Sequence, residues 1–146
     1  MQPSITRVVA AGVLGTLVMT AVGVYVAPEM GLPPMNPADM LASRMGGVQA
    51  LGWIGHLMIG VVLAVIFAKL VFGRLPGPGV LQGALFSIAP WLMAQLIVMP
   101  MMGMPVFSGS IQMAVGSLIG HLVYGAVIGA VIGTAVARPV VQGARP

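Results

Sequence analysis

Four long apolar stretches, separated by short polar or proline-rich segments, dominate the pattern of hydrophobic and polar positions along this chain. Each stretch is long enough to cross the hydrocarbon core of a bilayer, which takes about 20 helical residues. The pattern therefore predicts an all-α integral membrane protein with four transmembrane helices. The predicted spans cover residues 8–27, 48–70, 80–99 and 111–137.

The segments between the spans predict where the chain turns. Asn36, Pro37 and Asp39 supply a cap, a first-turn proline and an acid near the positive end of a helix dipole, which predicts a short outer helix over residues 37–44. Prolines alternating with glycines after Arg74 cannot continue a helix and predict an inner turn. The predicted units are a first hairpin (1–74), the inner turn (75–79), a second hairpin (80–137) and a cytoplasmic tail (138–146).

Composition agrees with a membrane protein of one compact unit. Only 5% of the 146 residues are charged, whereas about 25% is typical of soluble domains. Most basic residues fall on one predicted side of the membrane, and Glu29, Asp39 and Arg44 fall on the other. The basic side comprises Arg7, Lys69, Arg74, Arg138 and Arg145. The positive-inside rule then puts both termini in the cytoplasm, and the scattered basic residues predict no nucleic-acid partner.

The chain contains an internal repeat. Val26 to Pro33 and Val98 to Pro105 share the pattern V-x-P-x-M-G-[LM]-P, and both halves carry Ile-Gly-His-Leu, around His56 and His121. Because each half has two spans, both halves insert with the same orientation. The repeat predicts two tandem hairpins related by a pseudo-two-fold axis along the membrane normal.

The two histidines are predicted to lie at one depth and to face protein. His56 precedes Lys69 by 13 residues, or roughly 20 Å of helix, which puts it in the outer half of the bilayer. Each histidine belongs to an i+4 row of small residues, the kind that marks close helix contacts in membranes. The rows are Gly52, His56, Gly60, Ala64 and Ala68, and Ser117, His121, Gly125, Gly129 and Gly133.

A b-type haem that transfers electrons is the leading hypothesis for these residues. Bis-histidine ligation takes imidazoles from two helices at one depth, which His56 and His121 would supply. Gly60 and Gly125 would leave room for the porphyrin faces, and Gln95 is predicted to come within a turn or two of the same level.

Copper binding or passage is the second hypothesis. The chain has 13 methionines, and several cluster near the outer ends of the spans. Thioether and imidazole ligands suit Cu(I), so a metal site is predicted from His56, His121, Met30 and Met102.

Two further interpretations need no ligand. Each histidine can serve as a structural hydrogen-bond donor to a carbonyl, Thr20 or Gln95, worth about 0.6–2 kcal/mol in a membrane. The chain can also be a structural subunit that packs through its glycines in a homo-oligomer or a larger membrane complex. Without cysteine, paired carboxylates or a Ser-His-acid set, the sequence does not favour an enzyme.

Several local motifs resemble those of an uncharacterised bacterial family of small four-helix membrane proteins, a domain of unknown function. The motifs are Pro28-x-Met30-Gly31, Gly52-Trp53-Ile54-Gly55-His56, Ala89-Pro90-Trp91 and Pro100-Met101-Met102-Gly103-Met104. The resemblance covers nearly the whole chain and implies a helical fold in the bacterial inner membrane. It implies no activity.

Overall fold

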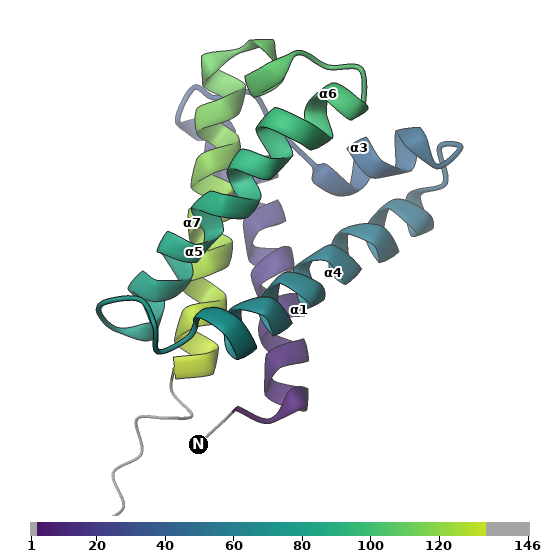
Figure 1. Cartoon of the computed structure of the whole chain (residues 1–146). Coiled ribbons are helices and arrows are strands. Elements are labelled where there is room, and N and C mark those ends of the chain that lie inside the picture. The colour runs from purple at the N-terminus through teal and green to yellow at the C-terminus, as the bar shows by residue number, and fades with distance from the viewer. Residues whose placement is uncertain (1–2, 134–146) are drawn as a thin grey trace, which may run out of the picture.

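The computed structural model describes residues 3–133, and within them the chain forms four long helices and no strands (Figure 1). All four are long and apolar enough to cross a membrane, as the sequence predicts. They cover Ile5–Glu29, Gln49–Val71, Gly79–Met101 and Ile111–Gly133. The predicted tail, residues 138–146, and the predicted last residues of the fourth span lie outside the described residues.

Local sequence explains where the elements start. Helix α1 (Ile5–Ala21) begins after Ser4, whose side chain accepts a hydrogen bond from the Arg7 amide. The short helix α3 (Pro37–Arg44) begins after Asn36, whose side chain accepts from the Ala38 amide at 3.1 Å. The remaining helices are α4 (Gln49–Ile66), α5 (Gly79–Met93) and α7 (Ile111–Gly133).

The first and third long helices both contain a π-helical turn before a proline. In the first, η1 (Val22–Val26) leads into α2 (Ala27–Glu29), and in the third, η3 (Ala94–Val98) leads into α6 (Met99–Met101). These helices continue two residues past the predicted span ends at residues 27 and 99, to Glu29 and Met101, because proline is tolerated in the first turn after each π segment. The same succession thus recurs 72 residues later, as a structural counterpart of the sequence repeat. A further π-helical turn, η2 (Phe67–Val71), ends the second long helix.

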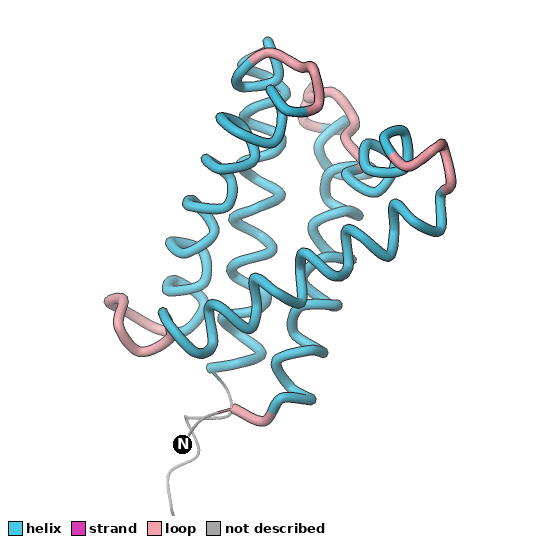
Figure 2. Tube along the Cα trace, turned by 45° about the vertical axis from the view of Figure 1, so that its right-hand side comes forward, coloured by secondary structure: helices cyan, strands magenta, loops and turns pink. Residues whose placement is uncertain are grey.

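The helices pack in the spatial order α4, α1, α7, α5. α1 packs on α4 and α7, and α7 packs on α5, whereas α4 makes at most isolated contacts with α5 and α7. Only η2, at the end of the second long helix, packs on α5. Figure 2 shows α4 crossing the others at a slant, so that the bundle is open along one side. If a two-fold axis related the two hairpins, the α1–α7 contact would have a counterpart between α5 and α4. That counterpart is nearly absent.

The glycine rows mark close contacts within each hairpin. A Cβ at Gly125 would lie 2.8 Å from the Ser87 Cβ of α5, and one at Gly12 would lie 2.7 Å from the Val61 backbone of α4. Gly60 faces Thr16 of α1. The rows on α4 and α7 therefore bring each helix close to a neighbour in its own half, and they do not pack against each other.

We call the end that carries α3 and α6 the outer end, and the end with the turn at residues 75–79 the inner end (Figure 1). The inner half of the bundle holds a tightly packed apolar cluster, in which several side chains are 0–4% exposed. Its most buried members are Val8, Ala11, Ala64, Phe67, Tyr124, Ile128 and Ile132.

Candidate functional site

A cavity of about 180 Å³ lies in the outer half, bounded by α1, α3, α4, α5, η3 and α7. His56 and His121 both line it, as do Gly60, Gln95 and Met102 from the predicted site. The rest of the lining is mainly apolar and rich in sulfur. Its methionines are Met19, Met35, Met40, Met93, Met99 and Met102.

The ring of His56 is anchored by α1. Its Nε2 lies 3.0 Å from the hydroxyl oxygen of Thr20, and that hydroxyl donates to the carbonyl of Thr16 at 2.8 Å. A hydroxyl has one proton, so Thr20 accepts the second hydrogen bond and Nε2 of His56 carries the donated hydrogen. The neutral ring therefore has its unshared electron pair on Nδ1.

The ring of His121 is anchored within its own helix. Its Nδ1 lies 2.8 Å from the carbonyl oxygen of Ser117, one turn earlier in α7. Because a carbonyl can only accept, Nδ1 carries the hydrogen and Nε2 has the unshared pair. The two histidines thus use opposite nitrogens for support, and each keeps one unprotonated nitrogen without a protein partner.

Gln95 joins the outer loop to α7. This side chain is 1% exposed, its oxygen accepts from the Ser108 hydroxyl at 3.2 Å, and its nitrogen donates to the Ser117 hydroxyl at 3.1 Å. Both ends of a buried amide are therefore satisfied. Since Ser117 also supports His121 through its carbonyl, the chain of bonds runs from the loop to the second imidazole.

Ser108 and Ser117 take part in the site in ways that the sequence did not predict, although Ser117 belongs to the predicted small-residue row of α7. Ser108 lies in a 3₁₀ turn, η4 (Val106–Gly109), where Phe107 and Ser108 adopt φ values of 52° and 57°. These left-handed conformations are uncommon for residues other than glycine, and they turn the Ser108 side chain inward. In the sequence, Ser108 stands out only as one of two serines just before α7, and the other serine, Ser110, supplies the cap.

Two predicted site residues lie elsewhere. Met30 is 60% exposed and does not line the cavity, because the turn after α2 directs it outward. Gly125 packs against Gly83 of α5 instead of leaving room beside His121. The position next to it is the relevant one: Tyr124 lines the cavity and donates to the carbonyl of Gly60 at 2.5 Å, which joins α7 to α4 beneath the two histidines.

The cavity has no charged lining residue among the described part of the chain. Residues 3–133 also contain no cluster of three or more His, Cys, Asp or Glu side chains suited to a metal ion. Above the cavity, the guanidinium of Arg44 of α3 donates to the carbonyl of the lining residue Met102. That bond links the two halves of the chain at the outer end.

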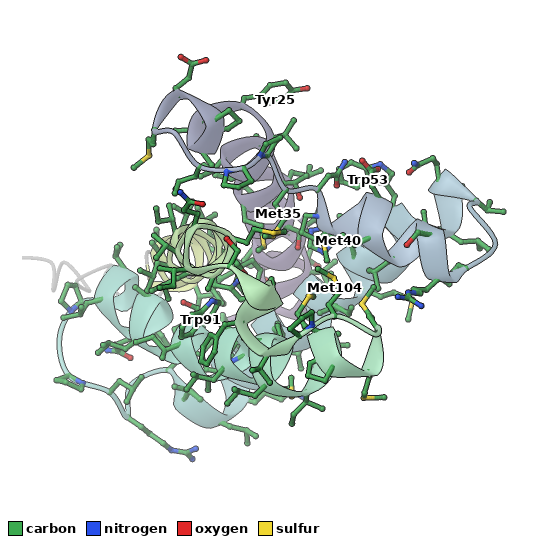
Figure 3. All side chains as sticks on the ribbon, turned by 90° about the horizontal axis from the view of Figure 1, so that it is seen from above. Tyr25, Met35, Met40, Trp53, Trp91 and Met104 are labelled. Atoms are coloured by element: carbon green, nitrogen blue, oxygen red, sulfur yellow. The ribbon has the colours of Figure 1, made fainter. Side chains whose placement is uncertain are left out.

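The view from the outer end shows where the sulfur atoms gather. In Figure 3 the side chains of Met35, Met40 and Met104 point toward the centre of the bundle, whereas Tyr25 and Trp53 lie toward its edge. Met35 and Met40 line the cavity itself. The site is thus a small, neutral chamber with two imidazole nitrogens and many thioethers.

Comparison with known proteins gives one match. The model of a family described as a family of unknown function, DUF6789, matches residues 3–142. No curated protein and no solved structure matches the chain.

Proposed function

This chain belongs to the DUF6789 family of unknown function. From its site we propose that it is a membrane protein that binds a soft monovalent cation, copper(I), in the cavity lined by the two histidines and the methionines. The observation that carries this proposal is the pair of anchored imidazoles, each with an unprotonated nitrogen, in a chamber lined by six methionines.

Membrane insertion is part of the proposal. The long helices expose large apolar side chains over most of their outward surfaces, as lipid contact requires. Examples are Leu14, Leu17, Ile54, Met58, Val62, Leu92, Leu96 and Ile97. Arg7, Lys69 and Arg74 lie toward the inner end and Glu29 and Asp39 toward the outer end, so the positive-inside rule puts the inner end in the cytoplasm. A bacterial inner membrane fits this orientation.

The supports of the two rings are typical of metal ligands. A histidine that binds a metal usually donates its other ring N–H to a carbonyl or a similar acceptor, which fixes the tautomer and the ring orientation. Thr20 does this for His56, and the Ser117 carbonyl does it for His121. Imidazole and thioether together are the donor types that favour Cu(I).

The neutral lining favours one positive charge over two. A divalent ion in an apolar interior needs anionic ligands to offset the loss of hydration, and Glu29 and Asp39 do not line the cavity. Polarisable neutral sulfur ligands suit a soft monovalent ion better. We therefore expect Cu(I) and Ag(I) to bind, and Zn²⁺, Mg²⁺ and Ca²⁺ to bind weakly or not at all.

A bis-histidine haem remains the second candidate, because imidazoles from two helices face one cavity. It needs more rearrangement. The cavity of about 180 Å³ is close to the ~150 Å³ cavity that holds a single benzene. The free Nδ1 of His56 also lies beside its own Cβ, where a flat macrocycle would meet the backbone. Haem would require α4 to move away from α5 and His56 to release Thr20.

A chelator competition with the purified protein in detergent tests the proposal. Wild type should take one Cu(I) per chain from a calibrated chelator, and His56→Ala and His121→Ala should each lose at least tenfold in affinity. Met102→Leu should lose several-fold, whereas Met58→Leu, which is 61% exposed on α4, should not change. A Soret band that disappears in the histidine variants would instead establish haem. A folded protein that binds neither would leave the ligand-free structural subunit.

A further inference from the structure

The cavity is confined to the outer half of the bundle. Its lining comes from α1 no further inward than Thr16, from α4 no further than Leu63 and from α7 no further than Tyr124. Beyond these positions α1 and α7 continue toward the inner end for two or more turns, and α4 leads into η2, which ends at Val71. The chamber therefore has a floor within the bundle.

That floor is sealed by packing. Tyr124 is 2% exposed and its hydroxyl is bonded to Gly60. Further inward, Phe67 is fully buried, with its ring centroid 5.7 Å from that of Phe72 and 5.4 Å from that of Phe86. Ile128 of α7 is fully buried in the same cluster. Ala64 of the second long helix and Ile132 of α7 are fully buried beside them.

In the described part of the inner half, the buried polar side chains already form hydrogen bonds within the protein. The Gln82 side chain donates to the Gly77 carbonyl and accepts from the Gly73 amide, so it organises the inner turn. The Ser87 hydroxyl donates to the Ala84 carbonyl of its own helix. A cation moving inward would thus lose its ligands in an apolar region, where an uncompensated charge is strongly disfavoured.

The outer side differs. Met35 and Met40 line the cavity, and Met104 points toward the same central region in the view from the outer end (Figure 3). The cover there is made of α3, of loops and of the link between the Arg44 guanidinium and the Met102 carbonyl, and Arg44 itself is exposed. Water competes with an exposed hydrogen bond of this kind, so the cover can open there.

We infer that the cavity exchanges its ion with the outer side only, through the mouth spanned by Arg44 and Met102, and that the chain is an outer-face metal receptor and not a route across the membrane. This inference rests on the proposed function, since it concerns the same ion and the same site. It selects binding over passage, which the sequence alone left open.

Vesicles of defined orientation test the inference. The chain lacks cysteine, so Met45→Cys at the outer end, 42% exposed, gives a single label site. In proteoliposomes an impermeant maleimide then measures the fraction of chains whose outer end faces the bath. After loading with Cu(I) in detergent and reconstitution, an impermeant sulfonated chelator is added outside, with a second chelator trapped inside.

The expected result is that the external chelator removes Cu(I) from the labelled fraction of chains alone. Arg44→Ala should speed this removal several-fold, while Arg74→Ala, an exposed arginine that bonds a carbonyl at the inner end, should leave it unchanged. Removal from the unlabelled fraction, or delivery of externally added Cu(I) to the internal chelator, would overturn the inference. Absence of Cu(I) binding in detergent would instead refute the proposed function, so the two failures are distinct.

Discussion

Thr20 Oγ1 lies 3.0 Å from Nε2 of His56, and this contact between α1 and α4 determines which imidazole nitrogen is left for a ligand. The threonine is 5% exposed, and its own proton is committed to the Thr16 carbonyl. A single hydroxyl therefore fixes both the tautomer and the orientation of the ring. The same geometry serves a purely structural histidine, so its role must be tested through affinity.

Thr20→Val should lower Cu(I) affinity about 10–100-fold, the usual cost of losing a supporting partner of a ligating histidine. The valine matches threonine in shape but leaves the Nε2 hydrogen of His56 without an acceptor. Chelator competition measures the affinity. Thr20→Ser keeps the hydroxyl and should stay near wild type; a valine variant with wild-type affinity would refute the supporting role.

Gln95→Leu should loosen the outer loop. It removes the acceptor of the Ser108 hydroxyl and the donor to Ser117, and each buried polar group left unpaired costs about 1–3 kcal/mol. Hydrogen exchange should rise at residues 106–109. Gln112→Leu changes an exposed glutamine on α7 and should have no such effect. Unchanged exchange in the first variant would show that Gln95 does not hold the loop.

Gly125→Ala should destabilise the contact between α5 and α7. The new Cβ would lie 2.8 Å from the Ser87 Cβ, so the helices must separate at a cost of about 1–3 kcal/mol. Thermal unfolding in detergent measures the loss. Gly116→Ala is the matched control, because its nearest neighbour, Leu32, would be 3.9 Å away. Equal unfolding temperatures for the two variants would contradict the packing argument.

Tyr124→Phe should cost about 0.5–1.5 kcal/mol, the net value of one hydrogen bond, because the bond to the Gly60 carbonyl is lost while the ring stays buried. The unfolding midpoint should fall, and Cu(I) should still bind in detergent. Tyr25→Phe, at a residue that is 73% exposed, should not change the midpoint. If Tyr25→Phe lowered the unfolding midpoint more than Tyr124→Phe does, the hydrogen bond of Tyr124 would not be the stabilising one.

Cu(I) itself should stabilise the protein. A ligand that binds only the folded state at 100 times its dissociation constant adds about 2.7 kcal/mol. The apparent unfolding temperature should therefore rise with Cu(I) in wild type and fall back when an excess of chelator removes the ion. Zn²⁺ at the same concentration should have little effect. Equal stabilisation by Zn²⁺ would refute the selectivity argued from the neutral lining.

The sequence predicted the helices well because their signals are local. Apolar runs define the four spans, and Asn36 with Pro37 defines the start of α3. The span ends at residues 27 and 99 were placed two residues too early, because the helix continues through each proline after a π-helical turn, to Glu29 and Met101. Nothing in a hydropathy pattern reveals a π-helical turn.

The partners of each helix face could not be predicted from local sequence. The glycine rows on α4 and α7 identify close-packing faces, but α4 uses its row on α1 and α3, and α7 uses its row on α5. The open side between α4 and α5 depends on the sum of all these contacts. Ser108 entered the site through a left-handed loop conformation that its sequence does not signal.

The π-helical turn η3 also makes the length of its helix as important as its side chains. A π-helical turn closes over five residues where an α-helical turn closes over four, so η3 contains one residue of slack. Deleting one residue within η3 would let the helix revert to α geometry, and Met99 and Met102 would keep their direction toward the chamber. Deleting one residue from the regular helix α5 would instead rotate everything beyond it by about 100°. Relatives of this chain should therefore accept a one-residue difference in length within η3 more readily than within α5.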